Sequence, residues 1–518
     1  MSQVDYETVP YRSVPYGATQ PTHVGAVASL FGLSPAVPST ASVLELGCAS
    51  GGNLIPLAVR YPDARFVGVD LSERHVGDGQ ATVHALGLGN IEIRQGDIAE
   101  LTYPADAFDY IICHGVYSWV PPAAQDAILR IAAKSLCPDG VLYVSYNIYP
   151  GWHLRTIVRD ICLYHAGETG APELRVARAR WALKQMAENA SDVTPYGQLL
   201  RQEAALNAKM PDSYIMGEFL ATHNAPCHFH EFIARAAAAG LAYLSETDLS
   251  ASLPETMPSE TAKLIRSIAG DSGMAVEQYM DFFAGRQFRR SILMRADQQG
   301  RTSRAIGAQK LADLHISTSF REEAPEKDGD PVPFAGIRGK IAVSDPGLLA
   351  ILRYLGTAFP DTRTPAEIRE HLIDLGNIPS DSSELDLLRA LFSLVAAQKL
   401  EIYSEPQRVG RASDPHPEIW LLARYQAASG QEWVASQSHN VMRVNPGSAR
   451  ILAMLDGTRD RAALIETFSD ALADGSLELS KERLPADMPR AQILQVAGHA
   501  LDDMLAKVEQ QALLRPNS

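Results

Sequence analysis

The sequence predicts a doubly wound, Rossmann-like α/β sheet with a helical insertion, followed by two small winged-helix-like α+β modules. Three observations predict this architecture. Short β-branched runs alternate with helical segments early in the chain, the apolar period then becomes that of helices, and the last third contains an internal repeat. A chain of 518 residues also exceeds the size at which one hydrophobic core keeps growing, so several domains are expected.

The first domain is expected over residues 26–154. Its strand-like runs are bounded by Gly, Asp or Pro, and they read VLELG, RFVGVD, IEIRQGD, FDYIICHG and GVLYVSYN. Amphipathic segments such as NLIPLAVRYP and AAQDAILRIAAKSL separate these runs. Strands joined by helices need crossover connections, which make a sheet mostly parallel and right-handed. The sheet is therefore predicted to be doubly wound.

A helical insertion is expected over residues 155–225, where long Ala-, Leu- and Arg-rich stretches contain no convincing strand. Residues 226–298 return to strand-like runs and are expected to complete the first sheet with a last crossover and an antiparallel edge pair. The core is thus predicted to be discontinuous in sequence. Residues 316–333, which include EEAPEKDGDP, are polar and acidic and are predicted to be a linker.

Two modules are expected beyond this segment, over residues 334–410 and 415–518. Pro346 recurs as Pro446, and each is followed by Gly, an Ile-Leu pair and a Leu at the same spacing. Each copy contains a strand, a helix opened by Asp-Pro or Asn-Pro, a Thr-Arg turn and a final helix, an order that suits a winged helix. Neither copy has a basic recognition helix, which favours protein contact or packing over DNA binding.

Composition and charge limit the classes of partner. The formal net charge is −15 and no dense basic run occurs, so a nucleic-acid partner is not expected. The acidic surface is either simply solvated or steers a lysine-rich substrate. No segment approaches the run of about 20 apolar residues that a membrane helix needs, so no membrane insertion is expected. Without a signal-peptide pattern, and with five widely spaced cysteines, a cytoplasmic location is expected.

Histidine and cysteine gather once, at His223, Cys227, His228 and His230. Their spacing matches no structural zinc site, and His230 belongs to a predicted helix start. No metal is therefore expected.

A glycine-rich loop, Gly47 to Gly52, lies between the first predicted strand and a predicted helix. Glycine permits positive φ and close approach of a ligand, and a helix N-terminus offers unpaired N–H groups to a carboxylate or phosphate. By itself such a loop is equally compatible with a tight turn that binds nothing.

Two aspartates add weight to the loop. Asp70 ends the next predicted strand, about 20 residues on, where an acidic side chain can bind both hydroxyls of a ribose. Asp97 ends the third predicted strand, where it and Ile98 can border an adenine, although a solvated turn aspartate is the alternative. All three features lie at the carboxyl ends of successive strands, where open α/β sheets bind ligands. A nucleoside-containing cofactor is therefore predicted.

The form of the loop favours S-adenosylmethionine over a dinucleotide. A dehydrogenase loop reads GxGxxG and leaves room for a pyrophosphate. The present loop instead matches the methyltransferase GxGxG, with Ala49 in place of the middle glycine. The predicted cofactor site comprises Tyr11, Glu45, Gly47, Cys48, Ala49, Gly51, Asn53, Asp70, Leu71, Asp97, Ile98 and His114.

Aromatic and polar side chains follow the fourth and fifth predicted strands, and they are expected to line an acceptor channel. The predicted catalytic residues are His114 and Tyr146, as proton acceptor or orienting group. Packing in the core is the alternative for the two tryptophans, and a structural role for His153. The predicted substrate-binding residues are Tyr117, Trp119, Asn147, Tyr149, Trp152 and His153.

Residues 1–25 are expected to form a lid over the cofactor. The segment from Tyr6 to Pro21 is rich in Tyr and Pro, too polar for core and too patterned for a plain tail. A flexible terminus is the alternative.

These runs resemble a known family, the class I methyltransferases that carry a methyltransferase regulatory domain. That family includes the protein lysine methyltransferases acting on rickettsial outer-membrane protein B. The resemblance spans most of the chain, although the C-terminal modules match only in order of elements. It rests on Tyr6, Pro10-Tyr11, Ser13, Pro15, Thr19 and Pro21; His114 to Pro121; Tyr146-Asn147; Tyr149 to His153; Pro211 to Tyr214; Phe229 to Phe232; and Glu277 to Phe282.

The resemblance implies a seven-stranded methyltransferase sheet and methyl transfer from S-adenosylmethionine to lysine side chains of a protein or peptide. A small-molecule or biosynthetic-peptide methyltransferase is the enzyme alternative, and a non-catalytic S-adenosylmethionine-binding regulator is the alternative of another class. The helical insertion and the two modules favour a large substrate. The insertion either forms a homodimer or packs onto the core.

Overall fold

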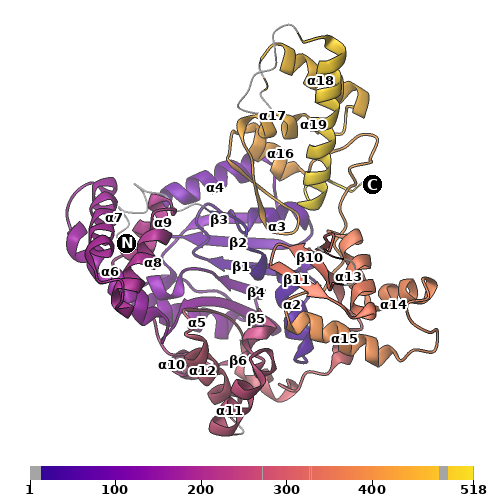
Figure 1. The fold of residues 1–518 in the computed structure, drawn as a ribbon. Coiled ribbons are helices and arrows are strands. Elements are labelled where there is room, and N and C mark those ends of the chain that lie inside the picture. The colour runs from indigo at the N-terminus through magenta and orange to yellow at the C-terminus, as the bar shows by residue number, and fades with distance from the viewer. Residues whose placement is uncertain are drawn as a thin grey trace.

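The fold was analysed in a computed structural model, which describes residues 13–516 apart from 271, 326, 328–329, 476 and 478–487. A seven-stranded sheet with the strand order β3-β2-β1-β4-β5-β7-β6 forms its centre (Figure 1). The strands are β1 Ser42–Leu46, β2 Arg65–Asp70, β3 Ile91–Gln95, β4 Phe108–Cys113, β5 Leu136–Asn147, β6 Leu241–Glu246 and β7 Phe288–Arg295.

Pairing within the sheet confirms the predicted doubly wound fold. Strands β3, β2, β1, β4 and β5 pair in parallel, whereas β7 runs antiparallel to both β5 and β6. The last two strands are supplied after the helical insertion, so the core is discontinuous as expected. Parallel strands are covered on both faces, which explains the nearly continuous apolar runs of β1, β2 and β4.

Helices cover the two faces of the sheet, and side-chain alternation along the strands divides the core between them. Leu44, Val67 and Ile111 pack with α5 and α10, whereas Val43 and Phe66 pack with α2 on the opposite face. The covering helices are α2 Pro21–Leu30, α3 Ile55–Arg60, α4 Glu73–Ala85, α5 Pro122–Ser135 and α10 Phe229–Ala238. Helix α12 Gly273–Ala284 contacts Arg289 of β7 through Glu277 and Asp281, and α11 Ser259–Ala269 packs on α12.

The end of the predicted lid segment, residues 1–25, belongs to a helix of the core. Residues 21–25 belong to α2, whose Val24, Ala26 and Val27 are buried in the core. Of the rest, the structure describes residues 13–20, which pack beside the glycine loop. Tyr6 and Tyr11 lie outside the described residues.

The helical insertion has a core of its own, which includes Val158, Leu183, Leu200 and Phe219. It extends from the sheet edge far from the C-terminal modules (Figure 1). Its helices are α6 Trp152–Ala166, α7 Pro172–Asn189, α8 Pro195–Asn207 and α9 Asp212–Phe219. Among the described residues, none of the helices is both long and apolar enough to cross a membrane.

The segment predicted to be a linker, residues 316–333, contains structure that belongs to the first module. Strand β8, His315–Ser317, pairs with β12, Glu401–Tyr403, and β9, Arg321–Glu322, pairs with β10, Val332–Gly336. Ile316 and Phe320 are buried in the core. The acidic, proline-containing composition predicted a linker. The strands were missed because their pairing partners lie elsewhere in the chain and leave no local signal in the sequence.

The internal repeat corresponds to two modules with matching helix order. In each, a strand leads into a helix whose first turn is capped by an Asx side chain: Asp345 accepts from Leu348 N at 2.8 Å, and Asn445 from Ser448 N at 2.7 Å. Module 1 contains β10, β11 Gly339–Val343, α13 Pro346–Ala358, α14 Pro365–Asp374, α15 Glu384–Ala396 and β12; module 2 contains α16 Leu421–Ala428, β13 Trp433–Ala435, β14 Val441–Arg443, α17 Pro446–Met454, α18 Arg461–Ala473 and α19 Arg490–Gln510.

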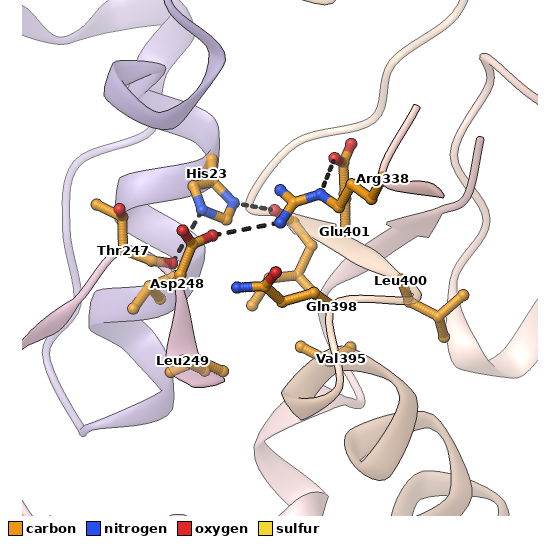
Figure 2. A pocket seen from close by; sticks show the side chains of 11 residues that line it. His23, Thr247, Asp248, Leu249, Arg338, Val395, Gln398, Leu400 and Glu401 are labelled. Atoms are coloured by element: carbon orange, nitrogen blue, oxygen red, sulfur yellow. Dashed lines mark hydrogen bonds and ion pairs between the residues drawn. The ribbon is translucent and has the colours of Figure 1, made fainter. Parts of the chain in front are cut away.

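Module 1 contacts the core through a polar cluster around His23 of α2 (Figure 2). The two ring nitrogens of His23 face the carbonyl oxygens of Ile402 and Thr247 at 3.1 and 3.2 Å. Beside them, Arg338 lies between two carboxylates, with Nη1 3.4 Å from Asp248 Oδ1 and Nε 3.3 Å from Glu401 Oε1. Arg338 belongs to the β10–β11 turn, residues 337–338, which we name the module 1 turn.

Candidate active site

The glycine loop turns sharply between β1 and α3. Gly47 has φ 78° and Ala49 φ 47°, so the alanine that replaces a glycine of the motif adopts a left-handed conformation that costs about 1 kcal/mol. A Cβ at Gly47 would lie 2.4 Å from Val116 Cγ2, so the side chain must be absent there. Gly51 also has a positive φ, 73°. The loop therefore exposes bare backbone at the carboxyl end of β1.

Asp70, at the end of β2, braces this loop. Its Oδ2 accepts from Ala49 N at 2.8 Å and its Oδ1 from Ser72 N at 3.0 Å. An ionised carboxylate has about four acceptor positions. Each oxygen therefore keeps capacity for a further donor, as contact with a ribose would require.

The two neighbouring strand ends present apolar and acidic groups together. Leu71 is 46 % exposed although it is a large apolar side chain. Asp97 is exposed at the end of β3 and caps the short 3₁₀ helix Ile98–Glu100 by accepting from Ala99 N at 2.9 Å. Ile98 is buried beneath it. An apolar surface flanked by carboxylates suits an adenosine, which has a flat ring and sugar hydroxyls.

Below the loop, the predicted residues Glu45 and Asn53 form a buried pair. Asn53 Nδ2 donates to Glu45 Oε1 at 2.9 Å, while Glu45 Oε2 has no hydrogen-bond partner among the described residues. Burial raises the pKa of Glu45 to about 8, against the lowering effect of the Asn53 bond. Cys48 is buried too, and its thiol packs against Gly68, so only its backbone faces outward to a ligand.

His114, at the end of β4, lies in a polar pocket between three residues. Its Nδ1 is 3.0 Å from Tyr143 Oη and 3.1 Å from Ser145 Oγ, and its ring stacks on Tyr16 with centroids 4.2 Å apart. Burial and the nearby charge of Arg290 lower the pKa of His114 to about 4. The imidazole is therefore neutral at pH 7 and a weak base, which favours an orienting role over proton acceptance.

Tyr146, the second predicted catalytic residue, lies on the opposite face of β5 from His114. Its hydroxyl hydrogen-bonds Ser291 Oγ at 3.0 Å and its ring stacks on Phe232, so the side chain is buried in the core. Successive side chains of a strand point to opposite faces. The adjacent residue Ser145, and not Tyr146, therefore lies beside His114.

The predicted aromatic walls separate into buried and accessible members. Tyr117 and Trp152 are buried, Tyr117 against Phe232 at 5.2 Å and Trp152 against the half-buried Trp119 at 5.9 Å between ring centroids. For Trp152 this is the packing alternative that the sequence left open. Tyr117 lies in the same core cluster as Tyr146.

The accessible part of the predicted acceptor region lies after β5. Tyr149 stacks on the exposed His153 at 3.9 Å between centroids, and His228 lies 5.4 Å from Tyr149. Asn147 is buried, and its backbone N donates to Ser118 Oγ at 2.9 Å. This bond joins the segments after β4 and β5, so both border the same edge of the sheet.

Three residues of this site were missed by sequence reasoning: Tyr16, Ser145 and Arg290. Arg290 Nη1 donates to Tyr16 Oη at 2.8 Å and its other guanidinium nitrogen pairs with Asp248. Tyr16 lies close in sequence to Ser13 and Pro15, on which the family resemblance partly rests. These neighbours could have indicated that Tyr16 belongs to the site. Ser145 could have been found from strand alternation, whereas nothing local marks Arg290.

Residues of the predicted cofactor site fit S-adenosylmethionine, apart from Tyr11, which lies outside the described residues. The bare loop, the acceptor capacity of Asp70 and the exposed Leu71 lie at adjacent strand ends. No group of three or more His, Cys, Asp and Glu side chains in the described part of the chain is arranged to hold a metal ion.

Comparisons with known proteins agree with this geometry. Residues 43–140 match the model of a methyltransferase domain, residues 211–295 that of a predicted methyltransferase regulatory domain, and residues 415–513 that of the PKMT C-terminal winged helix domain. An uncharacterized protein of Rickettsia prowazekii is 32% identical over 492 residues, covering 92% of this chain and 88% of the relative. A second uncharacterized protein of that organism is 34% identical over 236 residues, covering 45% of this chain and 94% of the relative.

Among solved structures, PKMT2 from Rickettsia typhi in complex with AdoHcy superposes with a TM-score of 0.85 at 26% identity. The match covers 98% of this chain and all of PKMT2 (100%), so it includes the insertion and both modules. The chain therefore belongs to the family of class I S-adenosylmethionine-dependent methyltransferases that carry a methyltransferase regulatory domain and a PKMT C-terminal winged helix domain.

Proposed function

We propose that this methyltransferase transfers a methyl group from S-adenosylmethionine to lysine side chains of a protein or peptide. The observation that carries the acceptor class is the likeness to PKMT2 along the whole chain, at a TM-score of 0.85. A likeness limited to the sheet would support only the use of the cofactor. The net charge of −15 adds support, because an acidic protein attracts a lysine-rich partner.

S-adenosylmethionine, when bound, supplies a methyl group on a sulfonium, so the protein mainly positions the two reactants and excludes water. Asp70 and the loop hold the ribose and methionine portions in this proposal, with Leu71, Asp97 and Ile98 beside the adenine. His114 and Tyr16 border the reacting centre and orient the acceptor. Tyr149, His153 and Trp119 line its approach.

Removal of the proton from the acceptor is the main chemical problem. A lysine amine has a pKa near 10.4, so deprotonating it at pH 7 costs about 4.6 kcal/mol. With a pKa of about 4, His114 is a poor acceptor for that proton. We therefore assign the proton to solvent, with burial of the acceptor amine lowering its pKa before transfer.

Labelled methyl transfer to a cell lysate tests this function. We expect incorporation into protein bands, with N-methyllysine found after hydrolysis. A labelled product of low mass would support the small-molecule alternative and contradict ours. Cofactor binding without any transfer would support the regulator.

Replacement of Asp70 tests the cofactor site directly. Asp70→Ala is expected to weaken S-adenosylmethionine binding about 100-fold, because the ribose loses its acceptor and the N–H groups of Ala49 and Ser72 lose theirs. Isothermal calorimetry measures the effect. The matched control is Asp78→Ala on the exposed face of α4. An unchanged dissociation constant for Asp70→Ala would refute the ribose contact.

We also propose that the helical insertion mediates contact between two copies of the chain. Tyr164 and Trp181 are 92% and 57% exposed on α6 and α7, outside the insertion's own core. Light scattering after gel filtration should give twice the chain mass. Trp181→Glu should give the mass of one chain, and a wild-type monomer would contradict the proposal.

A further inference from the structure

The β13–β14 turn of module 2, residues 436–440, reaches the cofactor loop from the far end of the chain. We name it the module 2 turn. It is fixed internally, because Asn440 N donates to Ser436 Oγ at 3.2 Å and Ser436 N to Asn440 O at 2.8 Å. His439 at its tip has φ 59°, which is uncommon for a residue other than glycine, and is only 1% exposed. The turn thus holds a buried imidazole in a strained position, which invites a functional reading.

The His439 ring ends on Asn53, the residue directly after the glycine loop. His439 Nε2 lies 2.7 Å from Asn53 Oδ1. The same oxygen accepts from Tyr16 N and Thr19 Oγ1, both at 3.0 Å. Since a backbone N–H can only donate, this atom of Asn53 must be the oxygen, and His439 must carry its hydrogen on Nε2. Burial, together with the charge of Arg60, lowers the pKa of His439 to about 3, so the ring is neutral at pH 7.

Asn53 thereby connects its own segment, directly after the glycine loop, to three others. Its amide nitrogen holds Glu45 at the end of β1, and its oxygen holds the N-terminal segment and the module 2 turn. A Cβ on Gly52 would lie 2.2 Å from Ser13 O, so the N-terminal segment sits directly on the loop. Tyr16 continues from Asn53 to the ring of His114.

The two residues that precede His439 in the module 2 turn are held by the core and by the segment that follows β12. Arg60 of α3 donates to Gln437 O at 2.5 Å, and Gln407 Nε2 donates to Ser438 Oγ at 2.5 Å. The apolar core of module 2 joins Cys48 and Ile55 in one buried cluster. In Figure 1, module 2 lies against the α3 and α4 side of the sheet. The turn therefore has a rigid support.

We propose that His439 is a positioning residue for the cofactor site, so that the winged helix module completes the glycine loop instead of being an appended domain. It donates the hydrogen bond that fixes Asn53 and, through Asn53, Glu45 and the segment that carries Tyr16. This inference rests on the use of S-adenosylmethionine by the enzyme. It requires no particular acceptor.

A pair of matched variants tests the proposal in the full-length enzyme. Gln reaches about as far as the His Nε2 and keeps a donor, whereas Met has a similar volume and no donor. We expect His439→Met to raise the KM and Kd for S-adenosylmethionine about tenfold with kcat within about twofold, and His439→Gln to remain near wild type. Equal values for the two variants would overturn the proposal, since a purely structural role would not distinguish them.

The control is His499→Ala, an exposed histidine of α19 in the same module, which should match wild type. Calorimetry of the wild-type protein separates the two hypotheses. If wild type fails to bind S-adenosylmethionine, the proposed function is wrong. If wild type binds and His439→Met binds equally well, only the role of His439 is wrong.

Hydrogen exchange of the wild-type protein supplies a test that needs no variant. Coupling between two sites is reciprocal, so a cofactor that is tightened by the module 2 turn must also stabilise that turn. Adding S-adenosylmethionine should slow exchange of amides in residues 436–440 as well as in residues 47–54. Slowing in the loop with no change in the turn would contradict the coupling.

Discussion

The module 1 turn and the module 2 turn are equivalent elements of a repeat, yet they contact the core by different chemistry. Arg338 of the module 1 turn is 35% exposed and forms ion pairs with Asp248 and Glu401. His439 of the module 2 turn is buried and forms a neutral hydrogen bond to Asn53. The repeat therefore preserved the framework of the modules while each turn acquired its own contact.

The two turns contact different parts of the core. We call the part around β6 and β7, within the regulatory-domain match, the regulatory side. We call the part around the glycine loop, residues 47–52, the cofactor side. On the regulatory side, the carboxylates after and within β6 face arginines of β7. On the cofactor side, the carboxylate of Asp70 accepts from backbone N–H groups of the loop and of Ser72, and the module 2 turn meets the amide of Asn53 through an imidazole. The half-exposed ion pairs of Arg338 should respond to salt, whereas the buried pairs of Arg289 should respond to removal of the partner. The neutral bond of His439 should respond to the loss of its donor.

The largest effect is expected from Arg289 on the regulatory side. Arg289 is fully buried among Glu246, Glu277 and Asp281, with N–O distances of 2.8 to 2.9 Å. Arg289→Met removes the cation that the three buried carboxylates share and leaves Glu277 with Arg304 and Asp281 with Arg286. We expect it to lower the free energy of unfolding by about 3–5 kcal/mol. Chemical denaturation measures this loss. Arg389→Met, at an exposed pair on α15, should change stability by less than about 0.5 kcal/mol; a similar loss for both would refute the interpretation.

Lowering the pH should remove the contribution of His439 to the free energy of unfolding before it removes that of Asp248. The unfolded chain protonates His439 below its ordinary pKa of 6.5, whereas the folded chain does not until about 3. Its contribution to stability is therefore full above pH 6.5 and falls by up to about 1.4 kcal/mol per pH unit below it. Denaturation curves between pH 7.5 and about 4.5 should show a shallower decline for His439→Gln than for wild type. Parallel declines would contradict the assignment.

Asp248 behaves in the opposite way at the module 1 contact. Burial opposes its ionisation, but Arg290 and Arg338 hold its pKa below the ordinary value of 3.8. The stability from this carboxylate is present above pH 3.8 and is lost only as the pH falls through the lower folded value.

Removing the module 1 contact should have a smaller effect. Arg338→Ala deletes a half-exposed pair while Asp248 keeps Arg290, so a loss of at most about 1 kcal/mol is expected. The S-adenosylmethionine dissociation constant should not change. A tenfold weaker dissociation constant would show that the two sides are coupled and would break the comparison.

The smallest effect is expected for Tyr16→Phe, at a residue that contacts Arg290 and His114. Tyr16→Phe removes the bond to Arg290 and keeps the stack on His114, so kcat should fall only about two- to threefold. Tyr16→Ala should lower kcat about tenfold further, because His114 loses its ring contact. Equal kinetics for the two variants would show that the stack has no role.

Local patterns predicted the sheet and the cofactor half of the site because each signal lay within one strand and its following turn. Asp70 and the glycine loop were found in this way. The hydrogen bond from Ala49 N to Asp70 shows that these two predicted parts of the site lie together. Tyr146 was placed by residue type, whereas the pleat of β5 decides which of two neighbours faces His114. Ser145 therefore lies beside His114, whereas Tyr146 points into the core.

Contacts between distant segments left no trace that one sequence can show. His439 and Asn53 are 386 positions apart, and each separately resembles an ordinary turn residue. The strands in residues 316–333 were missed for the same reason, since their partners lie in β10 and β12. The buried state of Trp152 depended on where the insertion packs, which its own composition does not specify.

Adjacent positions in β7 contact different parts of the molecule. Arg289 points into the carboxylate cluster and Arg290 toward Tyr16, because neighbours in a strand face opposite ways. Exchange of Arg289 costs the fold, whereas exchange of Arg290 alters the surroundings of His114 and leaves the cluster intact. One strand therefore carries two neighbouring arginines with separate roles, one in the carboxylate cluster and one beside Tyr16 and Asp248.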